Sequence, residues 1–146
     1  MTDPSPHSSS DTLAAVARFM QERDLFARQL GIELLDLQPG YSRAGLALAA
    51  YMVNGLGLPH GSVIFTLADF AFAAACNASG RAAVALSMDI HFLTSPPPGA
   101  YLIAEAVEVR TGNRTGLYRM TVKDSAENLV AEVHGMAYLK NTNFLE

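Results

Sequence analysis

The 146 residues of the chain suit a single domain that buries a substantial core without disulfides or a structural metal. Half of the residues are hydrophobic and only 16% are charged, which indicates an extensively packed, oligomeric globular protein. A net charge of −4 argues against binding to nucleic acid or to an anionic membrane surface. The single cysteine, Cys76, excludes an intrachain disulfide and a multi-cysteine metal site, and it fits a reducing, cytoplasmic setting.

Three parts are expected along the chain. Residues 1–10 are polar and rich in Ser and Pro, without the basic start and apolar centre of a signal peptide, so they predict a flexible tail. Residues 11–140 carry the periodic apolar patterns of one domain, with no internal repeats or heptads. Residues 141–146 are expected to form a second flexible tail.

The segments expected before the centre of the chain are a helix, a short helical turn and two strands, over residues 11–21, 25–30, 32–37 and 41–49. The first helix would be capped by Asp11 or Ser10, and its apolar residues recur at helical spacing on one face. Gly31 would end the helical turn, and Pro39-Gly40 is typical of a turn between strands.

Residues 62–77 form the central element of the predicted fold. This stretch is rich in Ala, has Gly61 or Ser62 at its start and Ser79-Gly80 just past its end, and therefore predicts a helix. It is apolar almost all round, which predicts burial on nearly every side, and it is too short to span a membrane. Its only charged residue is Asp69, and a lone carboxylate there is costly unless it is paired or open to a cleft.

The rest of the chain predicts four strands, over residues 82–92, 101–110, 115–123 and 129–139. The Pro-rich run 95–99 between the first two can be neither helix nor central strand, because proline lacks the N–H donor and fixes φ. Antiparallel strands around one apolar helix predict an α+β fold in which a sheet curls over that helix. The order of the strands is not visible in the sequence.

Two features of the central stretch suggest chemistry. The turn His60-Gly61 leads into the helix, whose N-terminus offers free N–H groups to an anion or a developing oxyanion, although glycine before a helix is also common without any such role. Asp69 could be a general base or nucleophile, or equally a satisfied core carboxylate. Asp69 lies about 12 Å further along the helix than Gly61, so one substrate carbonyl could meet both only between two subunits.

The stretch resembles the PaaI-like acyl-CoA thioesterases of the hotdog fold, the group that includes the phenylacetate-pathway enzyme. The resemblance is carried by the segments 54–55, 60–61, 65–69 and 71–77, and more loosely by later strands including the Thr115-Gly116 pair. The combination of Asn, His-Gly and a helical Asp at these spacings is specific. The resemblance implies a long antiparallel sheet wrapped around the helix, with subunits joined edge to edge as a homodimer or homotetramer.

The resemblance also implies roles for single residues. Asp69 would act as base or nucleophile on the thioester, and the Gly61 N–H of the other subunit would polarise the carbonyl. His60 and Asn54 would orient the carbonyl or the water, and Ser87 would help to position the attacking water. One departure is Ser62, where relatives usually have a second glycine: it could serve as a helix cap, or it could crowd the carbonyl site.

The phosphates of coenzyme A need local positive charge in an acidic protein. Arg110, Arg114 and Arg119 surround the predicted turn between the third- and second-last strands, where they could bind phosphate or simply be solvated. The residues predicted to bind the substrate's CoA part are Arg110, Asn113, Arg114, Thr115 and Gly116.

The leading hypothesis is hydrolysis of an acyl-CoA without metal or cofactor, coenzyme A being part of the substrate. The remaining histidines, His7, His91 and His134, are scattered and show no ligand spacing. Two alternatives stay open: a hotdog hydratase or dehydratase, which leaves the thioester intact, and a non-catalytic acyl-CoA-binding protein. Neither a nucleic acid nor a membrane is expected as a partner.

Overall fold

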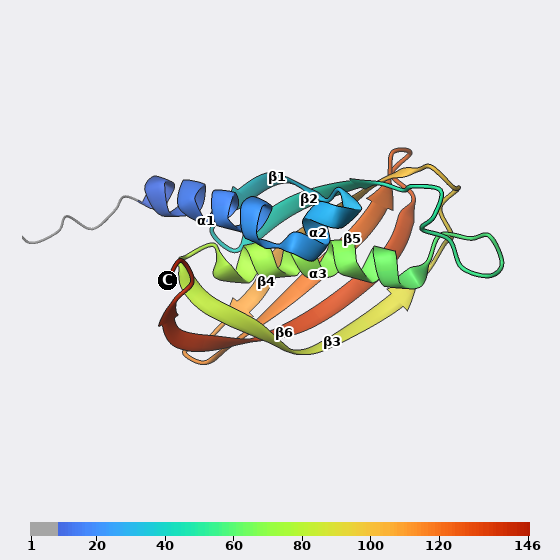
Figure 1. Cartoon of the computed structure of the whole chain (residues 1–146). Helices are drawn as coiled ribbons and strands as arrows, with labels where there is room; N and C mark the ends of the chain where they lie inside the picture. Colours follow the sequence, from blue (N-terminus) through green and yellow to red (C-terminus); the bar gives the residue numbers. More distant parts are fainter. Residues whose placement is uncertain (1–8) are drawn as a thin grey trace, which may run out of the picture.

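The computed structural model describes residues 9–146, and residues 1–8 of the expected N-terminal tail lie outside this part. The described chain holds three helices and six strands (Figure 1). The helices are α1 (Ser9–Arg23), α2 (Leu25–Leu30) and α3 (Gly61–Asn77). The strands are β1 (Glu33–Gln38), β2 (Tyr41–Ala47), β3 (Arg81–Phe92), β4 (Tyr101–Thr111), β5 (Thr115–Asp124) and β6 (Leu129–Asn143).

The strands form one antiparallel sheet in the order β1-β2-β4-β5-β6-β3. The sheet curls around α3, and α1 and α2 lie alongside that helix near β1 (Figure 1). Gln21 ties α1 to the start of β1: its Nε2 donates to the Ile32 carbonyl at 3.0 Å, and its Oε1 accepts from the Leu34 N–H at 2.8 Å. The expected α+β class, with an antiparallel sheet wrapped around a central helix, is confirmed.

Small side chains let the sheet approach α3 closely. Ala71 of the helix is fully buried, and its carbonyl accepts a hydrogen bond from the buried Ser42 hydroxyl of β2. Phe72 packs where β6 carries Gly135, because a Cβ atom at that glycine would stand only 3.0 Å from Phe72 Cε2. The Phe72 ring also meets Tyr118 of β5 edge-on, with 5.6 Å between ring centroids. This dense packing fixes the helix relative to the sheet.

One stripe of α3 is only partly covered by the sheet and by the other helices. Ser62 is exposed, and Thr66, Asp69 and Ala73 are partly exposed. Their spacing of three or four residues puts them on one face, here called the open stripe. The expectation of burial on nearly every side is therefore wrong for this face of the single chain. The sequence could not show it, because Ala and Thr suit both buried and exposed positions on a helix.

The boundaries of the helices largely follow the sequence signals. α3 begins at Gly61, one of the two predicted starts, and the chain turns after it at Gly80, whose φ is +86°. That left-handed conformation favours glycine. α1 is longer than predicted at both ends, since it begins at Ser9 and ends at Arg23. Among the described residues, no helix combines the length and apolarity needed to cross a membrane.

The end of the chain is more ordered in structure than the sequence suggested. β6 continues to Asn143, beyond the predicted end at Leu139. The Phe144 N–H then donates to the Gly80 carbonyl at 2.7 Å, and the Phe144 ring lies against Phe19 of α1 with 4.8 Å between centroids. Part of the stretch predicted as a tail therefore packs onto α1 and the end of α3.

Candidate active site

The first turn of α3 has one free backbone donor. In an α-helix the first four N–H groups lack partners within the helix. Here the Val63 and Ile64 N–H groups donate to the His60 carbonyl at 3.1 and 3.4 Å, and the Ser62 N–H donates to His60 Nδ1 at 3.2 Å. The Gly61 N–H has no acceptor in the described chain. It is the amide that remains available, at the positive end of the helix dipole, to an oxyanion.

His60 caps this helix with its side chain. Its backbone is extended, with φ −71° and ψ 131°, and its N–H donates to the Met52 carbonyl at 2.9 Å. The ring atom Nδ1 lies 3.2 Å from the Ser62 nitrogen and 2.6 Å from the Ser62 hydroxyl. Since Nδ1 is occupied by the helix, Nε2 is the ring nitrogen left for any contact with a substrate. The residue itself is exposed.

Asn54 holds the loop that delivers the chain to α3. Its Oδ1 accepts from the Leu56 N–H at 2.9 Å and from the Leu58 N–H at 3.1 Å. The backbone adds the Asn54 N–H to Leu58 carbonyl bond at 2.8 Å. With its oxygen committed to the loop, the side-chain amide of Asn54 offers its NH₂ group as a donor.

Asn54 and Gly61 line the same surface hollow, which has a volume of about 270 Å³. Its other walls are mostly apolar and come from the loop, α3 and the end of β3: Leu58, Pro59, Ile64, Phe92, Leu93, Thr94 and Ser95. The Phe92 ring lies directly beside Gly61, where an added Cβ atom would be 3.1 Å from Phe92 Cζ. The hollow thus combines two hydrogen-bond donors with an apolar wall, as a site for a carbonyl attached to an apolar group requires.

Asp69 lies in the open stripe, half-buried, and no hydrogen bond or ion pair reaches its carboxylate within the described residues. Burial raises the pKa of Asp69 above the usual aspartate value, and the nearby Asp24 carboxylate raises this pKa further. Asp24 is itself the N-cap of α2 and accepts from the Ala27 N–H at 3.0 Å. Asp69 does not line the hollow around Gly61, in keeping with a separation of about 12 Å along the helix.

Ser87 does not join these residues within one chain. It lies on β3 opposite Met136 of β6, just after a register shift that begins at Ala85. Its neighbours Met88 and Ile90 pack against the core. Because Met88 faces inward and adjacent side chains of a strand point to opposite faces, Ser87 points away from α3. Its predicted role in positioning water stays a prediction.

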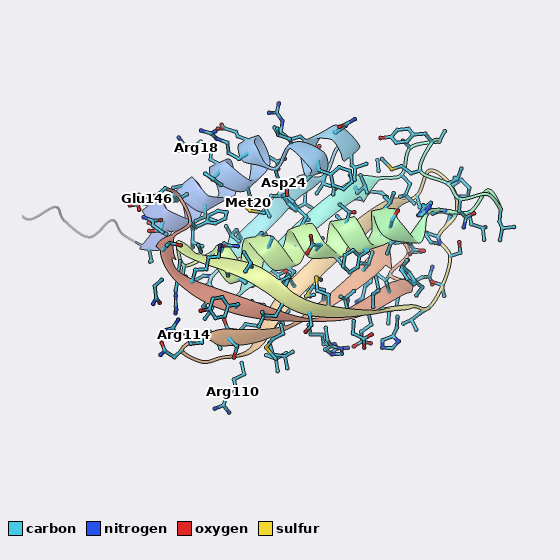
Figure 2. The ribbon with its side chains drawn as sticks, turned by 60° about the horizontal axis from the view of Figure 1, so that its bottom comes forward. Arg18, Met20, Asp24, Arg110, Arg114 and Glu146 are labelled. Atoms are coloured by element: carbon cyan, nitrogen blue, oxygen red, sulfur yellow. The ribbon has the colours of Figure 1, made fainter. Side chains whose placement is uncertain are left out.

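The predicted CoA-binding residues gather at the hairpin between β4 and β5. Arg110 and Arg114 extend from this hairpin at the surface of the molecule (Figure 2). Arg114 Nη1 donates to the Tyr138 hydroxyl at 3.1 Å, whereas Arg119 forms an ion pair with Glu132 at 2.7 Å. Of the remaining members of the group, Asn113 lies in the turn, and Thr115 and Gly116 begin β5.

This hairpin and the hollow lie at opposite ends of β3. The Arg114 carbonyl accepts from the Leu139 N–H at 2.8 Å, and Leu139 pairs with Ala83 near the start of β3. Phe92, at the other end of β3, lies beside Gly61. Within one chain, therefore, the arginines of the hairpin cannot reach a ligand in the hollow.

The single thiol of the chain is buried. Cys76 is 5% exposed, and burial raises its pKa to about 12, so the thiolate is not populated at neutral pH. Within residues 9–146, no group of three His, Cys, Asp or Glu side chains could bind a metal ion.

Two neighbours of the site were not predicted from sequence. Asp24 acts on Asp69 from α2, and the Phe92 ring covers one side of Gly61. Both contacts join segments far apart in the chain, so no local pattern announces them. Two neighbouring carboxylates, or an aromatic ring beside a glycine, can be found only once the fold has brought these segments together.

Known proteins resemble this chain over most of its length. The sequence profile of the Thioesterase superfamily matches residues 56–131, more than half of the chain. The acyl-coenzyme A thioesterase PaaI of Escherichia coli is 36% identical over 122 residues, which cover 84% of this chain and 87% of that protein.

Solved structures agree with the sequence comparison. The E. coli PaaI protein from the phenylacetic acid degradation operon superimposes with a TM-score of 0.89 at 34% identity, covering 93% of this chain and 99% of that one. A mutant of the phenylacetic acid degradation protein PaaI from Thermus thermophilus gives a TM-score of 0.76 at 36% identity, covering 79% and 98%. The chain therefore belongs to the thioesterase superfamily and is a thioester hydrolase with the hotdog fold.

Proposed function

We propose that the protein is an acyl-CoA thioesterase that hydrolyses an aryl-acetyl or medium-chain acyl-CoA to the free acid and CoA. The observation that carries the proposal is that one helix holds two unsatisfied groups among residues 9–146: the Asp69 carboxylate has no partner, and the Gly61 N–H has no acceptor. These are the two groups that ester hydrolysis needs: a base or nucleophile, and a donor for the oxyanion. The name of the E. coli relative, acyl-coenzyme A thioesterase PaaI, supports coenzyme A as the thiol.

The site is proposed to form between two copies of the chain. β3 is an edge of the sheet in the single chain, and its Val84, Leu86 and Phe92 side chains are 45%, 58% and 54% exposed. A long apolar edge strand is prone to pair with another strand unless it is covered. The opposite edge, β1, is shorter and has a register shift between Leu34 and Asp36, which protects it. Edge-to-edge pairing of two β3 strands gives a homodimer, the unit from which a homotetramer would be built.

Such pairing would bring the separated parts together. When two identical edge strands pair antiparallel about a two-fold axis, the start of one lies beside the end of the other. The β4–β5 hairpin of one copy, with Arg110 and Arg114, would then approach the hollow around Gly61 of the partner. The open stripe with Asp69 would face the same crevice. The proposed CoA-binding residues would thus act on a substrate whose carbonyl sits in the partner's hollow.

The proposed reaction uses groups of both copies. The thioester carbonyl would accept hydrogen bonds from the Gly61 N–H, with the NH₂ of Asn54 and Nε2 of His60 orienting the carbonyl or the water. As a general base, Asp69 would take a proton from the attacking water; as a nucleophile, it would form an anhydride that water then hydrolyses. In both routes the C–S bond breaks, and CoA leaves as a thiolate that takes up the proton.

The apolar wall of the hollow and the chemistry of the substrate suggest the kind of acyl group, the cofactor requirement and the compartment. Leu58, Ile64 and Phe92 would contact the acyl group, which favours an aromatic or medium-length chain over a polar one. The reaction needs no cofactor beyond the coenzyme A that the substrate carries. Because CoA esters are metabolic intermediates of the cell interior, we place the activity in the cytoplasm.

We expect Asp69→Asn to lower turnover of acyl-CoA by about 10² to 10⁴-fold. Release of free thiol from a panel of acyl-CoAs measures this, and it also excludes a hydratase, which leaves the thioester intact. Because the pKa of Asp69 is raised, the acid limb of wild-type kcat/KM should lie above the range of an ordinary aspartate. The variant should unfold at an equal or higher temperature at pH 8, since a half-buried charge is removed. Retained turnover would exclude Asp69 from the mechanism.

Gly61→Pro tests the backbone donor without removing the helix start. Proline suits the first helical position, and the extended backbone of His60, with ψ 131°, suits a residue before proline. We expect kcat to fall about 10² to 10³-fold, because the N–H is lost. Gly61→Ala is the matched control: it adds the same Cβ contact with Phe92 and keeps the N–H. Equal losses in the two variants would show that crowding, rather than the donor, matters.

Mixing two inactive variants tests whether the site spans two copies. Asp69→Asn and Gly61→Pro each inactivate both sites of a homodimer. A mixed dimer has one site with both defects and one with neither, so re-equilibrated mixtures should recover about a quarter of wild-type turnover. Subunit exchange is followed by native mass spectrometry on the same sample. Full exchange without recovery of turnover would mean that both groups act from the same chain.

Arg114→Gln should raise the KM for acyl-CoA about 10-fold while leaving the KM for an acyl thioester of N-acetylcysteamine unchanged, because only the former carries phosphates. Arg119→Gln serves as the control, since Glu132 already holds that guanidinium. Equal changes in KM for the two kinds of thioester would place the Arg114 side chain away from the phosphates.

A further inference from the structure

Ser62 makes two contacts with the same ring nitrogen. Its backbone N–H donates to His60 Nδ1 at 3.2 Å, and its hydroxyl oxygen lies 2.6 Å from that atom. A backbone N–H can only donate, so Nδ1 must carry the lone pair and the ring proton must be on Nε2. The hydroxyl is then a second donor that shares this lone pair with the N–H, and its contact with Nδ1 is the shorter of the two. The helix itself therefore selects the tautomer of His60.

The same contacts fix the direction of the ring. The main chain of His60 is held by its N–H to the Met52 carbonyl at 2.9 Å, and its carbonyl accepts from Val63 and Ile64. With backbone and Nδ1 both held, the ring can turn little about its side-chain bonds. Nε2 is the ring nitrogen that these contacts leave free, on an exposed residue that directly precedes Gly61.

We propose that Ser62 is a positioning residue, whose hydroxyl holds Nδ1 of the His60 ring so that Nε2–H serves as a fixed donor to the substrate. The inference rests on the proposed hydrolysis of a thioester, in which such a donor contacts the carbonyl or the attacking water. A positioning role and a crowding role for the Ser62 side chain predict opposite changes in turnover when the hydroxyl is removed. Removing the hydroxyl lowers turnover if it positions His60, and raises turnover if it crowds the substrate.

The ring contact is tested first by NMR. In the wild-type protein, a long-range ¹H–¹⁵N spectrum of the histidine rings should show His60 with a protonated Nε2 and with Nδ1 shifted as a hydrogen-bond acceptor. In Ser62→Ala, the Nδ1 signal should move toward that of a free imidazole, because the shorter bond is lost. Thr66→Ala is the matched control, since the Thr66 hydroxyl donates only to the Ser62 carbonyl, at 2.8 Å. A wild-type ring protonated at Nδ1 would overturn the proposal.

Turnover then separates positioning from a structural role. We expect Ser62→Ala to lower kcat about 3- to 10-fold with KM little changed, because the hydrogen bond acts through a donor used in the transition state. In a His60→Asn background, which keeps a good N-cap, the same substitution should have no further effect. Additive losses, or turnover at or above wild type in Ser62→Ala, would overturn the proposal. If the wild type releases no thiol at all, the proposed function fails, while the NMR result still decides the tautomer.

Discussion

The rigid length of α3 is the constraint on which the site depends. Gly61 begins this helix and Asp69 lies two turns further on, so a single chain holds the Gly61 N–H and the Asp69 carboxylate about 12 Å apart. Dense packing of Phe72 against Gly135 and Tyr118 prevents the helix from bending to close that gap. A small reacting carbonyl can meet both groups only if they come from different copies. The proposed assembly is therefore a consequence of helix geometry.

The start of the helix distributes its hydrogen bonds unevenly, and this shapes the site. His60 accepts three of the first N–H groups, two with its carbonyl and one with its ring. The Gly61 N–H receives no acceptor among residues 9–146. The side-chain oxygen of Asn54, in contrast, accepts hydrogen bonds from the Leu56 and Leu58 amides. Capping thus satisfies the backbone while leaving one free amide and one free NH₂ group on two residues that line the same hollow. Structural and chemical needs are met by the same few residues.

The sequence predicted the elements of the fold well, because their signals are local. The Ala-rich run before Gly80, the Pro39-Gly40 turn and the alternation along β4 each depend on residues close together in the chain. The open stripe could not be foreseen, since Thr66 and Ala73 fit a buried or an exposed position equally. The ends of α1 and β6 were also missed, because contacts such as Phe144 with Phe19 join the two ends of the chain.

For the site, the sequence indicated the chemistry but not the arrangement. Asp69 and the His60-Gly61 turn were singled out from their types and spacing alone. The cap formed by the His60 ring, the Asp24 carboxylate near Asp69 and the Phe92 wall all arise from tertiary packing. The orientation of Ser87 could not be predicted for a similar reason. Alternation along β3 would set the face on which its side chain lies, but the register shift between Ala85 and Ser87 interrupts that alternation.

The position of Phe92 at the end of the edge strand has a consequence for how activity depends on enzyme concentration. Phe92, the last residue of β3, lines the hollow beside Gly61, and β3 is the edge strand that a second copy would cover. In the proposed dimer, association and completion of the active site would be one event, so a dissociated subunit would be inactive. Specific activity would rise with enzyme concentration, and a cell making very little of this protein would have almost none of its activity.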